Sequence, residues 1–161
     1  MAISAAKSLS ALRMAIGVIF LIFAEYKVFG TQFTRHGGFQ YWINLFIAGG
    51  AYPFMLPLLR SFVLPHATSI AFLVAYGELA IGLSLVLGIM VRAASACGAL
   101  YMLALLFSAN YPGSHAAFWQ YFGASLDHSI LVLCFAAFAL TRTEEHYSVR
   151  RLLVGAQAKK T

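Results

Sequence analysis

The stretch HATSIAFLVAYGELAIGLSLVLGIM, from His66 to Met90, is apolar almost throughout and carries a single carboxylate, Glu78. About 20 apolar residues in a helix cross the roughly 30 Å hydrocarbon core of a bilayer, so this stretch predicts a transmembrane helix. Three more segments have the same character: Ser8 to Gly30, Arg92 to Tyr111 and Phe118 to Leu140. The chain is 61% hydrophobic and 10% charged, with a mean hydropathy of +0.82. This composition excludes an ordinary soluble domain.

The predicted fold is an all-α, polytopic membrane protein, a bundle of four transmembrane helices. Backbone polar groups in lipid must be hydrogen-bonded within the protein, and the alternating pattern of β-barrel strands is not visible. Because the chain has only 161 residues, we expect residues 1–161 to form a single membrane domain. Arg13, Glu25 and Lys27 lie within the first span and no small-residue cleavage site follows it, so we expect it to be retained and not removed as a signal peptide.

Lysine and arginine residues predict the orientation of the helices. The larger group falls on one side of the membrane and the smaller on the other: Lys7, Arg13, Arg92, Arg142, Arg150, Arg151, Lys159 and Lys160 against Lys27, Arg35 and Arg60. The positive side faces the cytoplasm, so both termini are expected there. The pI near 9.6 thus reflects topology and not nucleic-acid binding. The tail, residues 141–161, is expected to contact anionic lipid headgroups, with a partner protein as the alternative.

The loop between the first and second spans, from Thr31 to Pro65, is rich in aromatic residues. Phe39, Trp42, Ile43 and Phe46 follow helical spacing, which predicts an interfacial helix that caps the outer mouth of the bundle. The alternative is an ordinary aromatic belt, because Trp and Tyr collect at that depth without any function.

Three of the five acidic residues, Glu25, Glu78 and Asp127, interrupt the apolar segments. A carboxylate at the bilayer centre costs about 2.5 to 3.5 kcal/mol even on a lenient scale, so each is expected to be protonated, paired or facing a wet cavity. A rise of about 1.5 Å per residue places Glu78, Asp127 and His128 within roughly 3 Å of the same depth, with Glu25 and Lys27 nearer the outer surface. These residues predict one polar pocket in the outer half of the bundle.

Small residues predict how the second span packs. Ala80, Ser84 and Gly88 recur every fourth residue, a pattern that allows close approach of another helix. Glu78 and Gly82 lie on a different face. We therefore expect the second span to be central, with protein on more than one side.

Two stretches resemble a known family. The opening LRMAIGVIFLIFAEYK and the segment GELAIGLSLVLGIMVRAA are similar to the DoxX family of small four-helix membrane proteins. That family more often has a glycine shortly before the lysine, where this chain has Ala24 and Glu25. The resemblance therefore does not fix the ligand of this chain, which can differ from that of relatives. The resemblance implies an integral inner-membrane protein of the kind often associated with oxidoreductases, including a subunit of thiosulfate:quinone oxidoreductase.

The polar pocket supports two interpretations. In one, Glu78 and Asp127 share a proton and accept one from a quinol oxygen, with His128 as a relay. In the other, the carboxylates form a static network between the second and fourth helices, and His128 is simply hydrogen-bonded. Lys27 is expected to reach the outer headgroups or a carboxylate below it, and Arg13 the cytoplasmic headgroups.

Metal and haem sites are not predicted. His36, His66 and His115 lie near the outer face without the short spacing of a metal motif, and bis-histidine haem ligation would need a second deep histidine besides His128. Two cysteines at similar depth, Cys97 and Cys134, leave a redox pair conceivable. Without a CxxC motif we favour two buried apolar thiols.

The resulting hypothesis is a membrane protein that binds a quinone or similar amphiphile in the outer half of its bundle, as a component of an oxidoreductase system. The expected catalytic residues are Glu78, Asp127 and His128, and the expected ligand contacts are Glu25, Lys27, Gly82 and Trp42. A soluble or membrane-bound redox partner would supply electrons. The alternative is a non-catalytic anchor or assembly subunit whose buried charges are structural; the lack of an inverted repeat argues against a transporter. The expected location is a bacterial or archaeal inner membrane, and homo-oligomerisation stays open.

Overall fold

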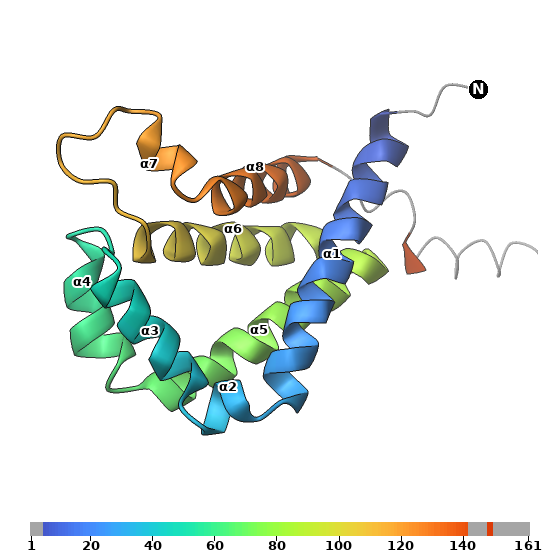
Figure 1. Cartoon of the computed structure of the whole chain (residues 1–161). Helices are drawn as coiled ribbons and strands as arrows, with labels where there is room; N and C mark the ends of the chain where they lie inside the picture. The colour runs from blue at the N-terminus through green and yellow to red at the C-terminus, as the bar shows by residue number, and fades with distance from the viewer. Residues whose placement is uncertain (1–4, 142–147, 150–161) are drawn as a thin grey trace, which may run out of the picture.

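The computed structural model describes residues 5–141 and 148–149, and every regular element in these ranges is helical (Figure 1). The main helices are α1 (Ala5–Phe29), α5 (Ala67–Leu87), α6 (Val91–Ser108) and α8 (Leu126–Leu140). Shorter elements lie between them: α2 (Gln32–Arg35), α3 (Gly38–Ala48), α4 (Met55–Leu58), the π-helix η1 (Leu59–Val63) and α7 (Gln120–Gly123). By length and composition α1, α5 and α6 can each cross a membrane, and α8 is apolar but shorter. The predicted all-α fold with four apolar helices is confirmed.

The main helices pack as two pairs. Figure 1 shows α1 crossing α5 and α8 running along α6, and these two pairs share the most extensive contacts. Phe135 of α8 packs on Gly98 of α6, where a Cβ would lie 2.5 Å from the ring. The same ring meets Phe20 of α1 edge-on, with the centroids 5.3 Å apart. The two pairs are therefore joined by a buried aromatic contact over a glycine.

Two glycines allow α1 and α5 to approach closely. A Cβ on Gly17 would lie 2.9 Å from Cβ of Leu85, and a Cβ on Gly82 would lie 3.1 Å from the carbonyl oxygen of Gly17 and 2.8 Å from the Leu21 side chain. Such distances leave no room for a larger residue in a packed interior. The structure thus places Gly82 in the contact between α1 and α5, and its predicted ligand contact stays a prediction.

The predicted seam of Ala80, Ser84 and Gly88 was wrong. Ala80 is exposed, and Gly88 ends α5 in the left-handed conformation with φ 70°. The buried face of α5 consists instead of Ala71, Ala75, Glu78, Ile81, Gly82 and Leu85. A pattern of small residues shows where a close approach is sterically allowed, but the face that meets protein is decided by the neighbouring helices.

The fourth apolar helix begins later than its predicted segment, 118–140. α7 ends at Gly123 and α8 begins at Leu126. Asp127 therefore lies in the first turn of α8, where a negative side chain complements the positive end of the helix dipole. The tail, residues 141–161, was predicted to contact lipid headgroups. Residues 142–147 and 150–161 lie outside the described part of the chain.

Arg13 does not extend to the headgroups as expected. Arg13 lies on α1 and is fully buried. A Cβ on Gly88 would lie 2.8 Å from Nη1 of Arg13 and 2.6 Å from Cβ of Ser148. The end of α5 and the segment at Ser148 thus cover this side chain.

The chain between α1 and α5 folds against the bundle. The predicted interfacial helix is present as α3, and its residues Phe39 and Ile43 are buried together with Leu59 and Ala71. Figure 1 shows α2, α3 and α4 gathered near the N-terminal half of α5 and the far end of α6, as their contacts also indicate. This segment forms a wall of the molecule and is more than a linker.

Tyr52 fastens the end of this wall. Its backbone N–H donates to the carbonyl oxygen of Phe107 at 3.0 Å, and its hydroxyl donates to the carbonyl oxygen of Tyr121 at 3.1 Å. Its ring also packs on Tyr111, with centroids 4.9 Å apart. The chain between α1 and α5 is thereby held to the C-terminal end of α6 and to α7.

We predict that Gly82→Val destabilises the fold whereas Gly77→Val, on the same helix, is tolerated. A valine at Gly82 would overlap the Leu21 side chain, and overpacking costs about 1–3 kcal/mol. At Gly77 no described atom lies within 4 Å of the Cβ position. Thermal unfolding in detergent, followed by circular dichroism, should show a lower midpoint for Gly82→Val only. Equal midpoints would mean that α1 and α5 do not meet at Gly82.

Candidate functional site

Three helices meet at the carboxylate of Glu78, in the middle part of α5. Lys27 of α1 forms an ion pair with it between Nζ and Oε1, and the hydroxyl of Tyr101 of α6 donates a hydrogen bond of 2.5 Å to the same Oε1. The side chains of Lys27 and Glu78 are only 15% and 6% exposed. A buried carboxylate persists only when it is paired and hydrogen-bonded. The cluster of Lys27, Glu78 and Tyr101 meets that requirement.

Aromatic rings lie close to the ammonium group of Lys27. Its Nζ is 5.1 Å from the ring centroid of Phe33 and 6.0 Å from that of Phe23. A cation within about 6 Å of an aromatic face is attracted by the ring quadrupole. The charge of Lys27 is therefore stabilised by a carboxylate and by two rings.

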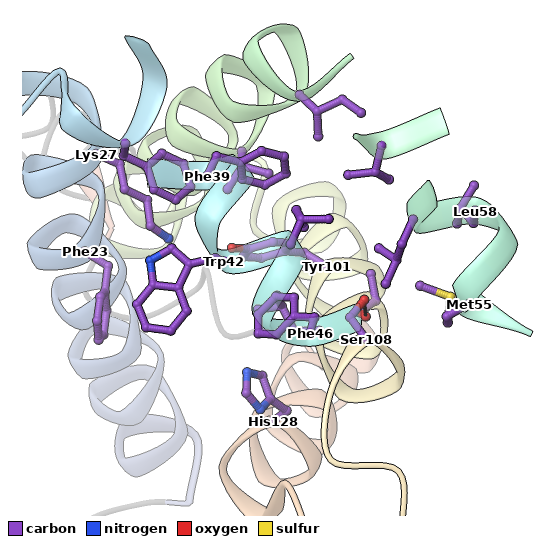
Figure 2. Close-up of a pocket in the computed structure, with 18 of the residues that line it drawn as sticks. Phe23, Lys27, Phe39, Trp42, Phe46, Met55, Leu58, Tyr101, Ser108 and His128 are labelled. Carbon is purple, nitrogen blue, oxygen red and sulfur yellow. Dashed lines mark hydrogen bonds between the residues drawn. The ribbon is translucent and has the colours of Figure 1, made fainter. Parts of the chain in front are cut away.

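A cavity of about 460 Å³, here called the aromatic cavity, lies beside this cluster. Figure 2 shows its labelled side chains, with Met55 and Leu58 on the side away from Lys27. Helices α1 and α3 supply most of its rings: Phe23, Tyr26, Phe39, Trp42 and Phe46. Further polar atoms come from Lys27, Tyr101, Ser108 and His128. The cavity thus combines flat apolar walls with a few hydrogen-bonding groups, which is typical of small-molecule sites.

The structure gathers only part of the predicted site. Lys27, Trp42 and His128 lie on the wall of the aromatic cavity. Glu78 is not itself part of this wall but bonds to Lys27 and to Tyr101, which are. Glu25 is exposed and lies outside the wall, because a residue two positions from Lys27 points to another face of the helix.

Asp127 is exposed, whereas Glu78 is buried. The Asp127 side chain is 73% exposed, and its Oδ1 is 3.0 Å from Nδ1 of His128. Within residues 5–141 no hydrogen bond or ion pair joins Asp127 to Glu78. The expected sharing of a proton assumed one continuous helix over 118–140, whereas α8 begins only at Leu126. The catalytic roles assigned to Glu78, Asp127 and His128 stay predictions.

Tyr101 bonds to Glu78 and lines the aromatic cavity, but it was not among the residues predicted for the site. A tyrosine inside an apolar helix carries a hydroxyl that needs a partner. Its position in the segment Arg92 to Tyr111 was therefore a usable signal. Which carboxylate it would meet depends on the rotation of α6 against α5, which the sequence does not display.

Metal-ligating side chains do not converge within the described part of the chain. No group of three His, Cys, Asp or Glu residues there has the geometry to hold a metal ion. Cys97 and Cys134 are free thiols, and Cys97 is exposed on α6. The side chains that line the aromatic cavity offer hydrogen-bonding groups and aromatic rings.

We predict that Lys27→Met is strongly destabilising and that adding Glu78→Gln recovers much of the loss. Removing one partner of a buried ion pair costs about 3–5 kcal/mol, because the other charge stays buried and unpaired. Unfolding of the wild type, both single variants and the double variant in detergent gives their coupling energy through a double-mutant cycle. Additive effects of the two substitutions would show that the residues are not paired.

Comparison with known proteins supports the membrane assignment. The DoxX family profile matches residues 8–111, more than half of the chain. This range contains Lys27, Glu78 and Tyr101 as well as all of α3, but it ends before His128. No curated protein and no solved structure matches the chain. With three apolar helices long enough to cross a bilayer, the chain is an integral, multi-pass membrane protein that belongs to the DoxX family.

Proposed function

We propose that the aromatic cavity binds the head group of a quinone or a similar amphiphile. The observation that carries this proposal is the cavity itself: about 460 Å³, lined by rings and bordered by Lys27, Tyr101 and His128. The volume falls within the range of about 300–1,000 Å³ that is usual for small-molecule sites. Aromatic walls suit a flat ring, which they contact over both faces at low cost in side-chain entropy.

The polar groups on the wall suit carbonyl oxygens. A quinone carbonyl only accepts hydrogen bonds, and a lysine ammonium has three N–H donors. The Lys27–Glu78 ion pair occupies one of them, which leaves donors for a ligand. The imidazole of His128, also on the wall, offers a second N–H. These donors favour an oxygen-rich ring over a plain hydrocarbon.

Proton exchange with a quinol has a short route in this arrangement. Tyr101 lines the cavity and donates to the Glu78 carboxylate. Tyr101 would pass its hydroxyl proton to Glu78 and take a proton from the quinol hydroxyl in its place. One proton would thus move from the quinol to Glu78 through a single intervening oxygen. We assign electron transfer to a separate redox partner, so that this chain acts as the quinone-binding membrane component of an oxidoreductase system.

Trp42 provides a direct test of binding. The chain has two tryptophans; Trp42 lines the aromatic cavity, and Trp119 is 69% exposed outside it. Quinones quench indole fluorescence on contact. In the Trp119→Phe variant, a short-chain ubiquinone analogue should quench Trp42 to saturation. In the Trp42→Phe variant, the remaining Trp119 should show only the linear quenching of a membrane background.

The same titration separates the proposed function from a purely structural one. In the Trp119→Phe background, Lys27→Met combined with Glu78→Gln removes the ammonium donor without leaving a buried charge. It should weaken binding about tenfold, the value of one hydrogen bond to a charged group. Linear, unsaturable quenching of Trp42 would instead favour a non-catalytic anchor or assembly subunit.

We propose in addition that both termini face the cytoplasm of a bacterial or archaeal cell, which puts α2 and α3 on the outer side. The support is the excess of lysine and arginine near the termini. In a Cys97→Ser, Cys134→Ser background, a membrane-impermeant maleimide should label His36→Cys on intact cells but Thr161→Cys only after lysis. Labelling of both positions on intact cells would contradict this orientation.

A further inference from the structure

A second cavity, of about 570 Å³, lies between α5 and α6 and is here called the aliphatic cavity. Its wall is formed mainly by aliphatic side chains and small residues, including Leu73, Ile81, Met90 and Ala93. Tyr101 and Val74 line both cavities. The two spaces therefore adjoin at the hydrogen bond between Tyr101 and Glu78, but they differ in the shapes that they favour.

Glu78 belongs to the wall of the aliphatic cavity and not to that of the aromatic one. Its two carboxylate oxygens are not equivalent. Oε1 accepts from Lys27 and Tyr101, whereas Oε2 is buried and has no hydrogen-bond partner among the residues that the structure describes. A buried acceptor without a donor is costly. A donor brought by an occupant of the aliphatic cavity would remove that cost.

The charges at this wall select the kind of donor. Lys27 already balances Glu78, and none of the other residues on the wall is a lysine, arginine, aspartate or glutamate. A cationic head group would compete with Lys27, and an anionic one would be repelled by the carboxylate. The fitting donor is therefore uncharged, and the aliphatic wall suits a flexible hydrocarbon chain.

We propose that the aliphatic cavity is a second binding site, for an uncharged lipid whose hydroxyl group donates a hydrogen bond to Oε2 of Glu78. The site does not depend on quinone binding, because the lipid uses the carboxylate oxygen that Lys27 and Tyr101 leave free. An occupant would hold Glu78 through the oxygen that its two protein donors do not use. It would thereby fix the carboxylate that α1, α5 and α6 share.

Cys97 reports on the occupancy of this cavity. It is exposed and lies on the wall, so an occupant should slow its reaction with N-ethylmaleimide. In purified Cys134→Ser protein, 1-dodecanol should protect Cys97 at concentrations about tenfold below those needed for its methyl ether. The ether has the same chain but no O–H donor. Equal protection by both compounds, or none by either, would overturn the proposal.

Two variants locate the effect. The double variant Lys27→Met, Glu78→Gln replaces the charged acceptor by a neutral amide without leaving a buried charge unpaired, and it should bring the dodecanol concentration needed for protection about tenfold closer to that of the ether. Gly77→Leu should abolish protection by filling the cavity, because no described atom lies within 4 Å of its Cβ position. Undiminished protection in Gly77→Leu would also contradict the proposal.

Quinone binding serves as the independent control. Gly77→Leu lies outside the wall of the aromatic cavity, so saturable quenching of Trp42 should be unchanged in that variant. Loss of dodecanol protection with intact quenching assigns the hydroxyl lipid to the aliphatic cavity alone. Failure of quenching in the unmodified cavity, with dodecanol protection retained, would contradict the proposed function and leave the second site standing.

Discussion

A carboxylate inside an apolar helix has to be compensated, and the bundle is organised around that need at Glu78. Lys27 from α1 supplies the opposite charge and Tyr101 from α6 supplies a hydrogen bond. Because the surroundings are poorly polarisable, an unpaired charge there would cost several kcal/mol. The cluster therefore fixes α1 and α6 relative to α5, and it specifies how the helices are rotated as much as how firmly they associate.

Small residues make this charge cluster geometrically accessible. Gly82 lies one helical turn beyond Glu78, and it contacts Gly17 and Leu21 of α1. The close crossing brings Lys27 within reach of the carboxylate on the next turns. On the other side, Gly98 accommodates the ring of Phe135, which holds α8 against α6. Glycine packing and ion pairing thus act together: one sets the distance between helices, and the other sets their register.

Helix α3 closes one side of the aromatic cavity. Without α3, Lys27 and Tyr101 would border an open face of α1 and α6. Trp42 and Phe46 of α3 complete the aromatic wall of the cavity, and Tyr52 fastens the chain between α1 and α5 to α6 and α7. The helical spacing of Phe39, Trp42 and Phe46 fitted either an interfacial helix or an ordinary aromatic belt. Their position on the cavity wall explains this spacing. Helix α3 therefore both packs in the core and lines the aromatic cavity.

Sequence alone determined the membrane class, the four apolar helices, the helix α3 and the need for Glu78 to be paired, because these follow from hydropathy, periodicity and the cost of burying charge. Tertiary structure decided which partners meet. Because residues 118–140 were expected to form one continuous helix, Asp127 was expected deep beside Glu78, and it instead lies exposed in the first turn of α8. Tyr101 and Gly82 acquired their roles only from the crossing and rotation of α5 against its neighbours. Composition determines which groups must be buried or paired, but the geometry between helices determines which side chains pair with one another.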